Sequence, residues 1–137
     1  MYRRKLKHSR VKNLFKFASQ KNNATCLVES ALEYDACFHF EYSPNIKSFE
    51  AQPLGFHYVY EDRKFPYTPD FLLHYNDGGQ KYLEIKTAKE LSKLEVRQRF
   101  EMKKLAAVQR GVELIAVTEN QIRVFPILDN LKLLHRY

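Results

Sequence analysis

Three polar residues in a strand-like part of the chain have the types and the spacing for chemistry. Asp70 follows Pro69, while Glu84 and Lys86 stand two residues apart after a Gly-rich turn. Strand interiors are depleted in such residues, so this stretch either exposes one face to water or holds a site. Two carboxylates and the Ile85 carbonyl offer the oxygen ligands that Mg2+ prefers, and a lysine can orient a bound water. The chemistry that fits is metal-assisted hydrolysis of a phosphodiester.

This chemistry depends on the register of the hairpin formed by "YTPDFLLHY" and "KYLEIK". Directly paired residues of an antiparallel pair point to the same side of the sheet. A three-residue loop after Tyr75 places Asp70 opposite Glu84, and a five-residue loop places it opposite Lys86. A four-residue loop separates the acids unless a bulge restores the phase. On spacing alone, the alternative is an exposed strand face with a Lys–Asp pair across the strands.

A third acid comes from the preceding segment. We expect a helix over Thr25–Tyr42, ended by Pro44, with Glu29 and Glu33 four residues apart on one face. Because this helix is apolar on most sides, a carboxylate on it is costly unless it is paired or metal-bound. Glu33 is our first choice for an acid directed at the cluster, and Glu29 is the second. The alternative is a glutamate that reaches water or an arginine.

The remaining patterns predict an α/β (α+β) fold with a mixed sheet flanked by helices, in the order helix, three strands, helix, strand. The three strands form a meander, and the second helix returns the chain for a parallel strand. That helix is expected to be capped by Ser92 and stopped by Gly111. The expected elements after the first helix are a connection at 43–53, strands at 55–62, 67–75 and 81–86, a helix at 92–110, a strand at 112–118, a short strand at 121–125 and a helix at 127–137.

The charge of the chain favours a polyanionic partner. Its 137 residues carry a formal net charge of +7, and the first 21 residues contain no acid. We expect residues 1–24 to be a basic arm that contacts DNA and residues 25–137 to be a single domain. A solvated tail and a mitochondrial presequence are the alternatives, the latter less favoured because no Ser-rich spacer follows. The residues expected to contact phosphates are Arg3, Arg4, Lys5, Lys7, Arg10 and Lys12.

The cysteines and the apolar residues of the sequence indicate where in the cell the protein is expected, and other residues are expected to lie outside the site. Cys26 and Cys37 make no disulfide framework, and on the expected helix they are too far apart to bridge. The chain has no apolar run of about 18 residues, so we expect no membrane partner and a reducing, cytoplasmic location. The residues expected outside the site are two strand histidines and a solvated basic helix face, namely His57, His74, Arg97, Arg99, Lys103 and Lys104.

The combined pattern resembles a known family. A helix with an acid, strands bearing Pro-Asp and Glu-x-Lys, a helix and a strand are similar to the core of the PD-(D/E)xK nucleases, the restriction-endonuclease-like fold. Within that superfamily the chain resembles the TnsA-like endonucleases of heteromeric cut-and-paste transposons. The stretches that carry this resemblance are "KNLFKFASQKNN", "VESALEYDACFHFEYSPNIKSFEAQP", "YTPDFL", "LEIK" and "NLKLLHRY".

The resemblance implies a role for each residue of the cluster. Glu33 is the helix acid of the active site, and Asp70 and Glu84 bind Mg2+ or Mn2+ with help from the Ile85 carbonyl. Lys86 positions the attacking water. The reaction is hydrolysis of one DNA strand at the 5′ ends of the transposon, which leaves a 5′-phosphate and a 3′-hydroxyl.

The resemblance also implies partners. A TnsB-like transposase cuts and joins the 3′ ends, and a TnsC-like ATPase regulates the pair. Members of the family commonly carry a further C-terminal, winged-helix-like domain that docks the ATPase. We expect this sequence to lack it, which leaves direct binding of the ATPase open. Gln52 matches a family position near the site, and a loop-ordering amide is its alternative role. Other nucleases of this fold (phage, repair or restriction) and an inactive DNA-binding module remain alternatives for the whole chain.

Overall fold

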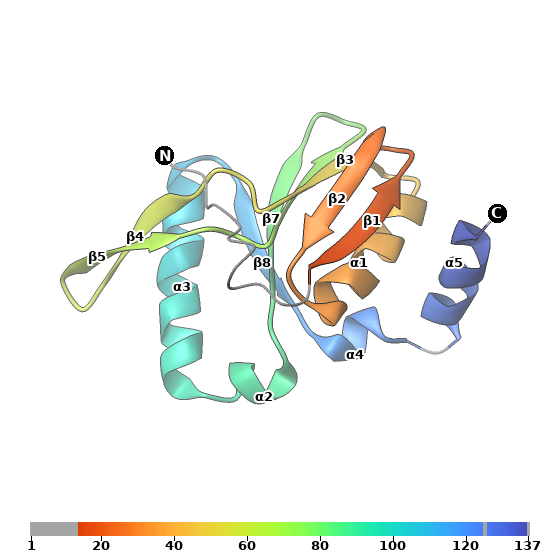
Figure 1. Ribbon diagram of the computed structural model, residues 1–137. Coiled ribbons are helices and arrows are strands. Elements are labelled where there is room, and N and C mark those ends of the chain that lie inside the picture. Colours follow the sequence, from red (N-terminus) through yellow and green to blue (C-terminus); the bar gives the residue numbers. More distant parts are fainter. Residues whose placement is uncertain (1–13, 125, 137) are drawn as a thin grey trace.

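A four-stranded mixed sheet forms the centre of the structure (Figure 1). The computed structural model describes residues 14–124 and 126–136. β3 and β7 run antiparallel to β6, which lies between them, and β8 runs parallel to β7. A parallel neighbour requires a crossover connection, which helix α3 supplies. In sheet order the strands are β3 (Ile46–Ala51), β6 (Phe71–Tyr75), β7 (Gln80–Ile85) and β8 (Glu113–Val117).

Two hairpins and five helices surround this sheet in the described part of the chain. One hairpin precedes α1, and the other lies between β3 and β6 in sequence without joining the central sheet. The bounds are β1 (Phe15–Ser19), β2 (Ala24–Val28), α1 (Ala31–Tyr42), β4 (Phe56–Tyr60), β5 (Arg63–Tyr67), α2 (Ala88–Leu91), α3 (Leu94–Gln109), α4 (Glu119–Ile122) and α5 (Ile127–His135).

Strand alternation divides the buried side chains between two cores, one on each face of the sheet. Phe71 and Leu83 face α1 and the β1–β2 hairpin, and the Phe71 ring lies 4.9 Å from that of Phe40. Leu72 and Tyr82 point the other way, toward α3 and the aromatic side chains of the β4–β5 hairpin. The strands that carry the site are therefore covered on both faces, and the expected mixed sheet flanked by helices is confirmed.

The start of the first helix differs from the prediction. Residues of β2 were expected to be helical, but α1 begins only after Ser30, whose hydroxyl accepts the Glu33 N–H at 3.1 Å. Ser30 and Glu33 have the spacing of an N-terminal capping box, a signal that the apolar run before them concealed. Glu29 therefore precedes the helix, and the prediction that it shares a helical face with Glu33 is wrong.

The two cysteines are also placed differently. Cys26 lies on β2 and Cys37 on α1, both buried and both free thiols. Their side chains are in hydrogen-bond contact. The argument that one helix holds them too far apart is therefore wrong.

The strand assignment needs two corrections. The predicted connection after α1 contains β3, which pairs with β6, whereas the aromatic strand β4 pairs with β5. The three predicted strands therefore do not form one meander. The predicted short strand at 121–125 is also wrong, because Gln121 and Ile122 belong to helix α4.

Helix α3 differs from the second predicted helix at its start and agrees with it at its end. It begins at Leu94 after Lys93, which makes no side-chain cap, so the expected Ser92 cap is wrong. The capping box in this region joins Thr87 to Glu90 and starts α2 instead. Gly111, at φ +80°, ends α3 as expected, with its N–H donating to Val108 O at 2.8 Å.

The folded part of the chain begins earlier than residue 25. Phe17 on β1 is only 1% exposed and packs in the core beside α1. The expected DNA-contacting residues from Arg3 to Lys12 lie outside the described residues. Across the two described ranges, no helix combines the length and the apolar character needed to cross a membrane.

Candidate active site

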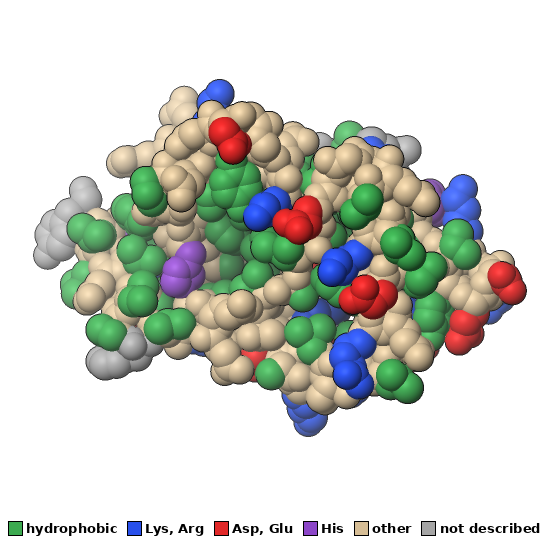
Figure 2. All heavy atoms as spheres, turned by 180° about the vertical axis from the view of Figure 1, so that it is seen from behind, with side chains coloured by type: hydrophobic (Ala, Val, Ile, Leu, Met, Phe, Trp, Pro, Cys, Tyr) green, Lys and Arg blue, Asp and Glu red, His purple; other side chains and the backbone are tan. Residues whose placement is uncertain are grey.

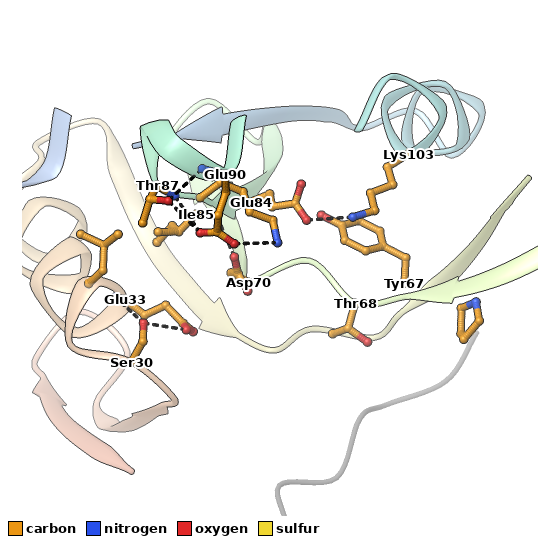
Figure 3. Close-up of a pocket in the computed structure, with 13 residues that line it drawn as sticks. Ser30, Glu33, Tyr67, Thr68, Asp70, Glu84, Ile85, Thr87, Glu90 and Lys103 are labelled. Carbon is orange, nitrogen blue, oxygen red and sulfur yellow. Dashed lines mark hydrogen bonds and ion pairs between the residues drawn. The ribbon is translucent and has the colours of Figure 1, made fainter. Parts of the chain in front are cut away.

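A cavity of about 710 Å³ opens where the start of α1, the end of β7 and the side of α3 meet (Figure 3). It is also lined by the segment between β5 and β6 and by the start of α2. Five residues singled out in the sequence line this cavity, namely Glu33, Asp70, Glu84, Ile85 and Lys86. These five residues come from three separate parts of the chain and meet at one place.

The loop between β6 and β7 sets the register of the site. Tyr75 N–H donates to the Gly79 carbonyl at 2.9 Å, which leaves a three-residue loop between them. Phe71 pairs with Leu83, and the Asp70 N–H donates to Leu83 O at 3.0 Å, one residue out of step with that pairing. The structure therefore has the three-residue loop, with a local irregularity where Asp70 enters the strand.

Asp70 carries an unusually basic carboxyl group. Its Oδ2 accepts the Ile85 N–H at 2.7 Å. Burial and the nearby Glu33 and Glu84 carboxylates raise the pKa of Asp70 to about 7, although the Ile85 hydrogen bond and the Lys86 charge oppose the shift. The neighbourhood of Asp70 thus has too little positive charge for its acids. A bound cation would correct this imbalance.

Glu84 has a counter-charge that the sequence analysis did not assign to it. Lys103 Nζ on α3 lies 3.1 Å from Glu84 Oε1, and the two side chains are 15% and 6% exposed. The prediction that Lys103 lies on a solvated helix face is therefore wrong. The missed signal is helical spacing, because Lys103 is three residues after Phe100 and four before Ala107, which are both buried.

Glu33 is buried at the first turn of α1 and is held from two directions. The Ser30 hydroxyl donates to its Oε2 at 2.9 Å, and the Gln52 amide donates to its Oε1 at 3.5 Å. Gln52 also donates its N–H to the Asp70 carbonyl at 3.0 Å, with φ at +50°. Gln52 therefore connects two of the acids, while Glu29 is not among the residues that line the cavity.

Lys86 lies at the edge of the cavity, where β7 has ended. Its Nζ is 3.9 Å from Glu90 Oε2, and its side chain is 29% exposed. Glu90 in turn accepts hydrogen bonds from the Thr87 N–H and hydroxyl at 3.0 and 3.1 Å. These bonds hold the pKa of Glu90 below its usual value. Glu90 is a second lining residue that the sequence analysis missed.

The donor set fits a hard divalent cation in its chemical types. Asp70 and Glu84 supply carboxylates, Ile85 supplies a carbonyl, and the raised pKa of Asp70 indicates a deficit of positive charge. Among residues 14–124 and 126–136, no three Asp, Glu, His or Cys side chains stand close enough together to form a ready-made metal site. In this arrangement Lys103 holds Glu84 instead (Figure 3).

The two histidines considered in the sequence do not line the cavity. His74 Nε2 lies 2.7 Å from Glu50 Oε2 across the β3–β6 pair. His57 lies on β4, with its side chain exposed.

A comparison with protein families places the chain. The family model described as the TnsA-like endonuclease N terminal matches residues 43–119, which is more than half of the 137 residues. The matched range contains Gln52, Asp70, Glu84, Lys86 and Lys103, while Glu33 precedes it. A search of curated proteins finds no match. With a mixed sheet, flanking helices and this match, the chain belongs to the family of TnsA-like endonuclease N-terminal domains.

Proposed function

We propose that this chain is the metal-dependent DNA endonuclease subunit of a heteromeric cut-and-paste transposase, with a restriction-endonuclease-like core. The observation that carries the proposal is the convergence of Asp70, Glu84 and Lys86 on one cavity in a chain of this family. The reaction is phosphodiester hydrolysis at the 5′ ends of the transposon. It leaves a 5′-phosphate and a 3′-hydroxyl.

The residues of the cavity have separate roles in this proposal. Asp70, Glu84 and the Ile85 carbonyl hold Mg2+ or Mn2+, with Glu33 as an additional acid beside Asp70. When bound, the cation supplies positive charge for the phosphoryl oxygens and for the attacking water. Lys86 orients that water from the cavity edge. Gln52 keeps Glu33 and the Asp70 backbone at a fixed separation, as its two hydrogen bonds support.

The proposed partners follow from the proposed role as a transposase subunit. The substrate is double-stranded DNA at the transposon ends, and the setting is the bacterial cytoplasm. A TnsB-like transposase cuts the other strand, and a TnsC-like ATPase regulates the assembly. The basic residues from Arg3 to Lys12 supply sequence-independent contacts to the DNA backbone.

The proposal is tested by a cleavage assay. The full chain, with its transposase partner, is incubated with end-labelled transposon-end DNA in Mg2+, Mn2+ or EDTA. We expect metal-dependent 5′-end cleavage that Asp70→Ala abolishes and that Glu101→Ala, an exposed acid on α3, leaves unchanged.

Two results would overturn the proposal. If Asp70→Ala cuts as well as the wild type, the site is assigned to the wrong residues. If the wild type binds the DNA but leaves it uncut in every metal, the chain is a DNA-binding module.

A further inference from the structure

Lys103 is held in the cavity by more than one contact. Its ammonium lies 4.4 Å from the centre of the Tyr67 ring and 5.6 Å from that of Tyr58, in addition to its pairing with Glu84. Aromatic faces attract a cation at such distances. The β4–β5 hairpin, which carries both tyrosines, therefore helps to fix the lysine from the side away from the sheet.

The Glu84 carboxylate is directed at this lysine. Figure 3 shows it beside Lys103 and Tyr67. A buried carboxylate without a counter-charge strongly destabilises a fold. The ammonium on α3 satisfies this requirement for Glu84 in the absence of a metal ion.

We propose that Lys103 is a built-in counter-cation that occupies Glu84 in the metal-free protein and competes with a divalent cation for it. The inference rests on the proposed function in treating Glu84 as a metal ligand. An ammonium and a hard cation seek the same carboxylate oxygens. Lys103 therefore stabilises the metal-free fold and lowers the affinity of the free subunit for the cation.

The test compares Lys103→Met with two controls in the full chain. Lys103→Arg keeps the charge. Lys104→Met removes a neighbouring charge, which lies 6.0 Å from the centre of the Phe100 ring. In EDTA we expect Lys103→Met to lower the melting temperature by on the order of 10 °C. Lys104→Met should leave it nearly unchanged, and Lys103→Arg should lose much less than Lys103→Met.

Calorimetric titration with Mn2+, without DNA, measures the competition. We expect Lys103→Met to bind Mn2+ more tightly than the wild type, by on the order of tenfold. A lysine that only packs against its neighbours, or one that assists the metal, predicts equal or weaker binding. Lys103→Arg should bind Mn2+ like the wild type.

A second pair of variants keeps the test valid if Lys103→Met folds poorly. In a Glu84→Gln background the carboxylate charge is gone, so adding Lys103→Met should lower the melting temperature far less than it does alone. Equal losses in both backgrounds would overturn the ion-pair role.

The titration separates the inference from the proposed function. Equal or weaker Mn2+ binding by Lys103→Met, with normal binding by the wild type, overturns the inference alone. Absence of Mn2+ binding in both proteins overturns the competition together with the proposed metal site.

Discussion

Asp70 is the residue on which the proposed chemistry depends most. Burial and two neighbouring carboxylates raise the pKa of Asp70 to about 7. Near neutral pH its surroundings therefore destabilise the ionised form of the side chain. Groups with such perturbed pKa values are common at functional sites, where a bound ligand can stabilise the charged form. Asp70 is therefore expected to lower the stability of the metal-free fold while serving the site.

Asp70→Asn should raise the stability of the metal-free fold and abolish cleavage. The substitution removes the charge but keeps an oxygen that can accept the Ile85 N–H, so we expect a gain in metal-free stability of about 2–4 kcal/mol at pH 8. Cleavage should be lost. Chemical denaturation in EDTA measures the gain, and an unchanged or lower stability would contradict this account of Asp70.

The sign of the pH dependence follows from the same shift. The pKa is raised from 3.8 to about 7, so the folded state binds more protons than the unfolded state between these values. The wild type should therefore lose stability relative to Asp70→Asn as pH rises from about 4 to 7, and no further above that. A stability difference that stays constant between pH 4 and 8 would show that Asp70 is not the group that titrates.

Much of the cavity could be predicted at this scale, and the reason is local geometry. Strand alternation puts Glu84 and Lys86 on one side of a strand whatever the rest of the chain does. Lys103 could not be assigned in the same way, because its direction depends on how α3 packs against the β4–β5 hairpin. That packing joins residues far apart in the sequence.

At the scale of elements, the β6–β7 loop sets the register of the two strands that carry Asp70 and Glu84. Its three residues bring Phe71 opposite Leu83, next to the two acids, and Gly78 adopts φ +90° within it. A Cβ at this position would meet no atom within 4 Å, so only the backbone conformation selects glycine.

Gly78→Ala should consequently destabilise the fold by about 1 kcal/mol, through the strain of a positive φ alone. Gly78→Asn should lose less, because asparagine tolerates this region of conformation better. Thermal melts of the two variants measure the difference. Equal melting temperatures for Gly78→Ala and the wild type would show that the loop tolerates another conformation.

The errors in element assignment have a common cause. "IKSFEA" and "FHYVY" both have strand-like patterns, but which of them pairs with β6 depends on contacts that no local pattern specifies. The start of α1 is a different case, since the Ser30–Glu33 capping signal was present in the sequence. The apolar residues of β2, which precede Ser30, conceal this signal because they also fit a helical pattern.

At the scale of the whole molecule, one acid joins α1 to the C-terminal helices. Asp35 accepts a hydrogen bond from Arg123 at 3.0 Å and pairs with Lys132 on α5 at 2.9 Å. The Asp35 side chain is 10% exposed, whereas both partners are about half exposed. Solvent therefore weakens each pair.

Asp35→Asn should destabilise the fold by about 1–2 kcal/mol because two cations lose their anion at once. Hydrogen exchange should rise first in α5, whose docking depends on Lys132. An increase spread evenly over the sheet and α5 would contradict this local role. The candidate active-site cavity is lined by Leu32 and Glu33 of α1 but not by Asp35, so metal binding at low temperature should be unaffected.

Positive charge is unevenly distributed over the molecule. On the face shown in Figure 2, acidic and basic side chains are interspersed with hydrophobic ones. The formal net charge of the chain is +7, and the first 13 residues contain no acid. Most of the excess comes from six residues there, namely Arg3, Arg4, Lys5, Lys7, Arg10 and Lys12.

Replacing these six residues with glutamine should weaken DNA binding and flatten its dependence on salt. If each one neutralises a phosphate, the slope of log K against log [salt] should fall by on the order of 3–5. Binding measured between 50 and 200 mM salt gives the slope, at about the range where this effect is large. An unchanged slope would mean that the basic segment is only solvated.

The central claim is that Asp70 and Glu84 hold the catalytic cation. The most direct measurement is the anomalous difference map of crystals containing the protein, Mn2+ and transposon-end DNA. The account predicts a Mn2+ peak bonded to both carboxylates and the Ile85 carbonyl, with Glu84 no longer paired with Lys103. A cleavage-active protein whose Mn2+ peak lies elsewhere, with the Glu84–Lys103 pair intact, would contradict it.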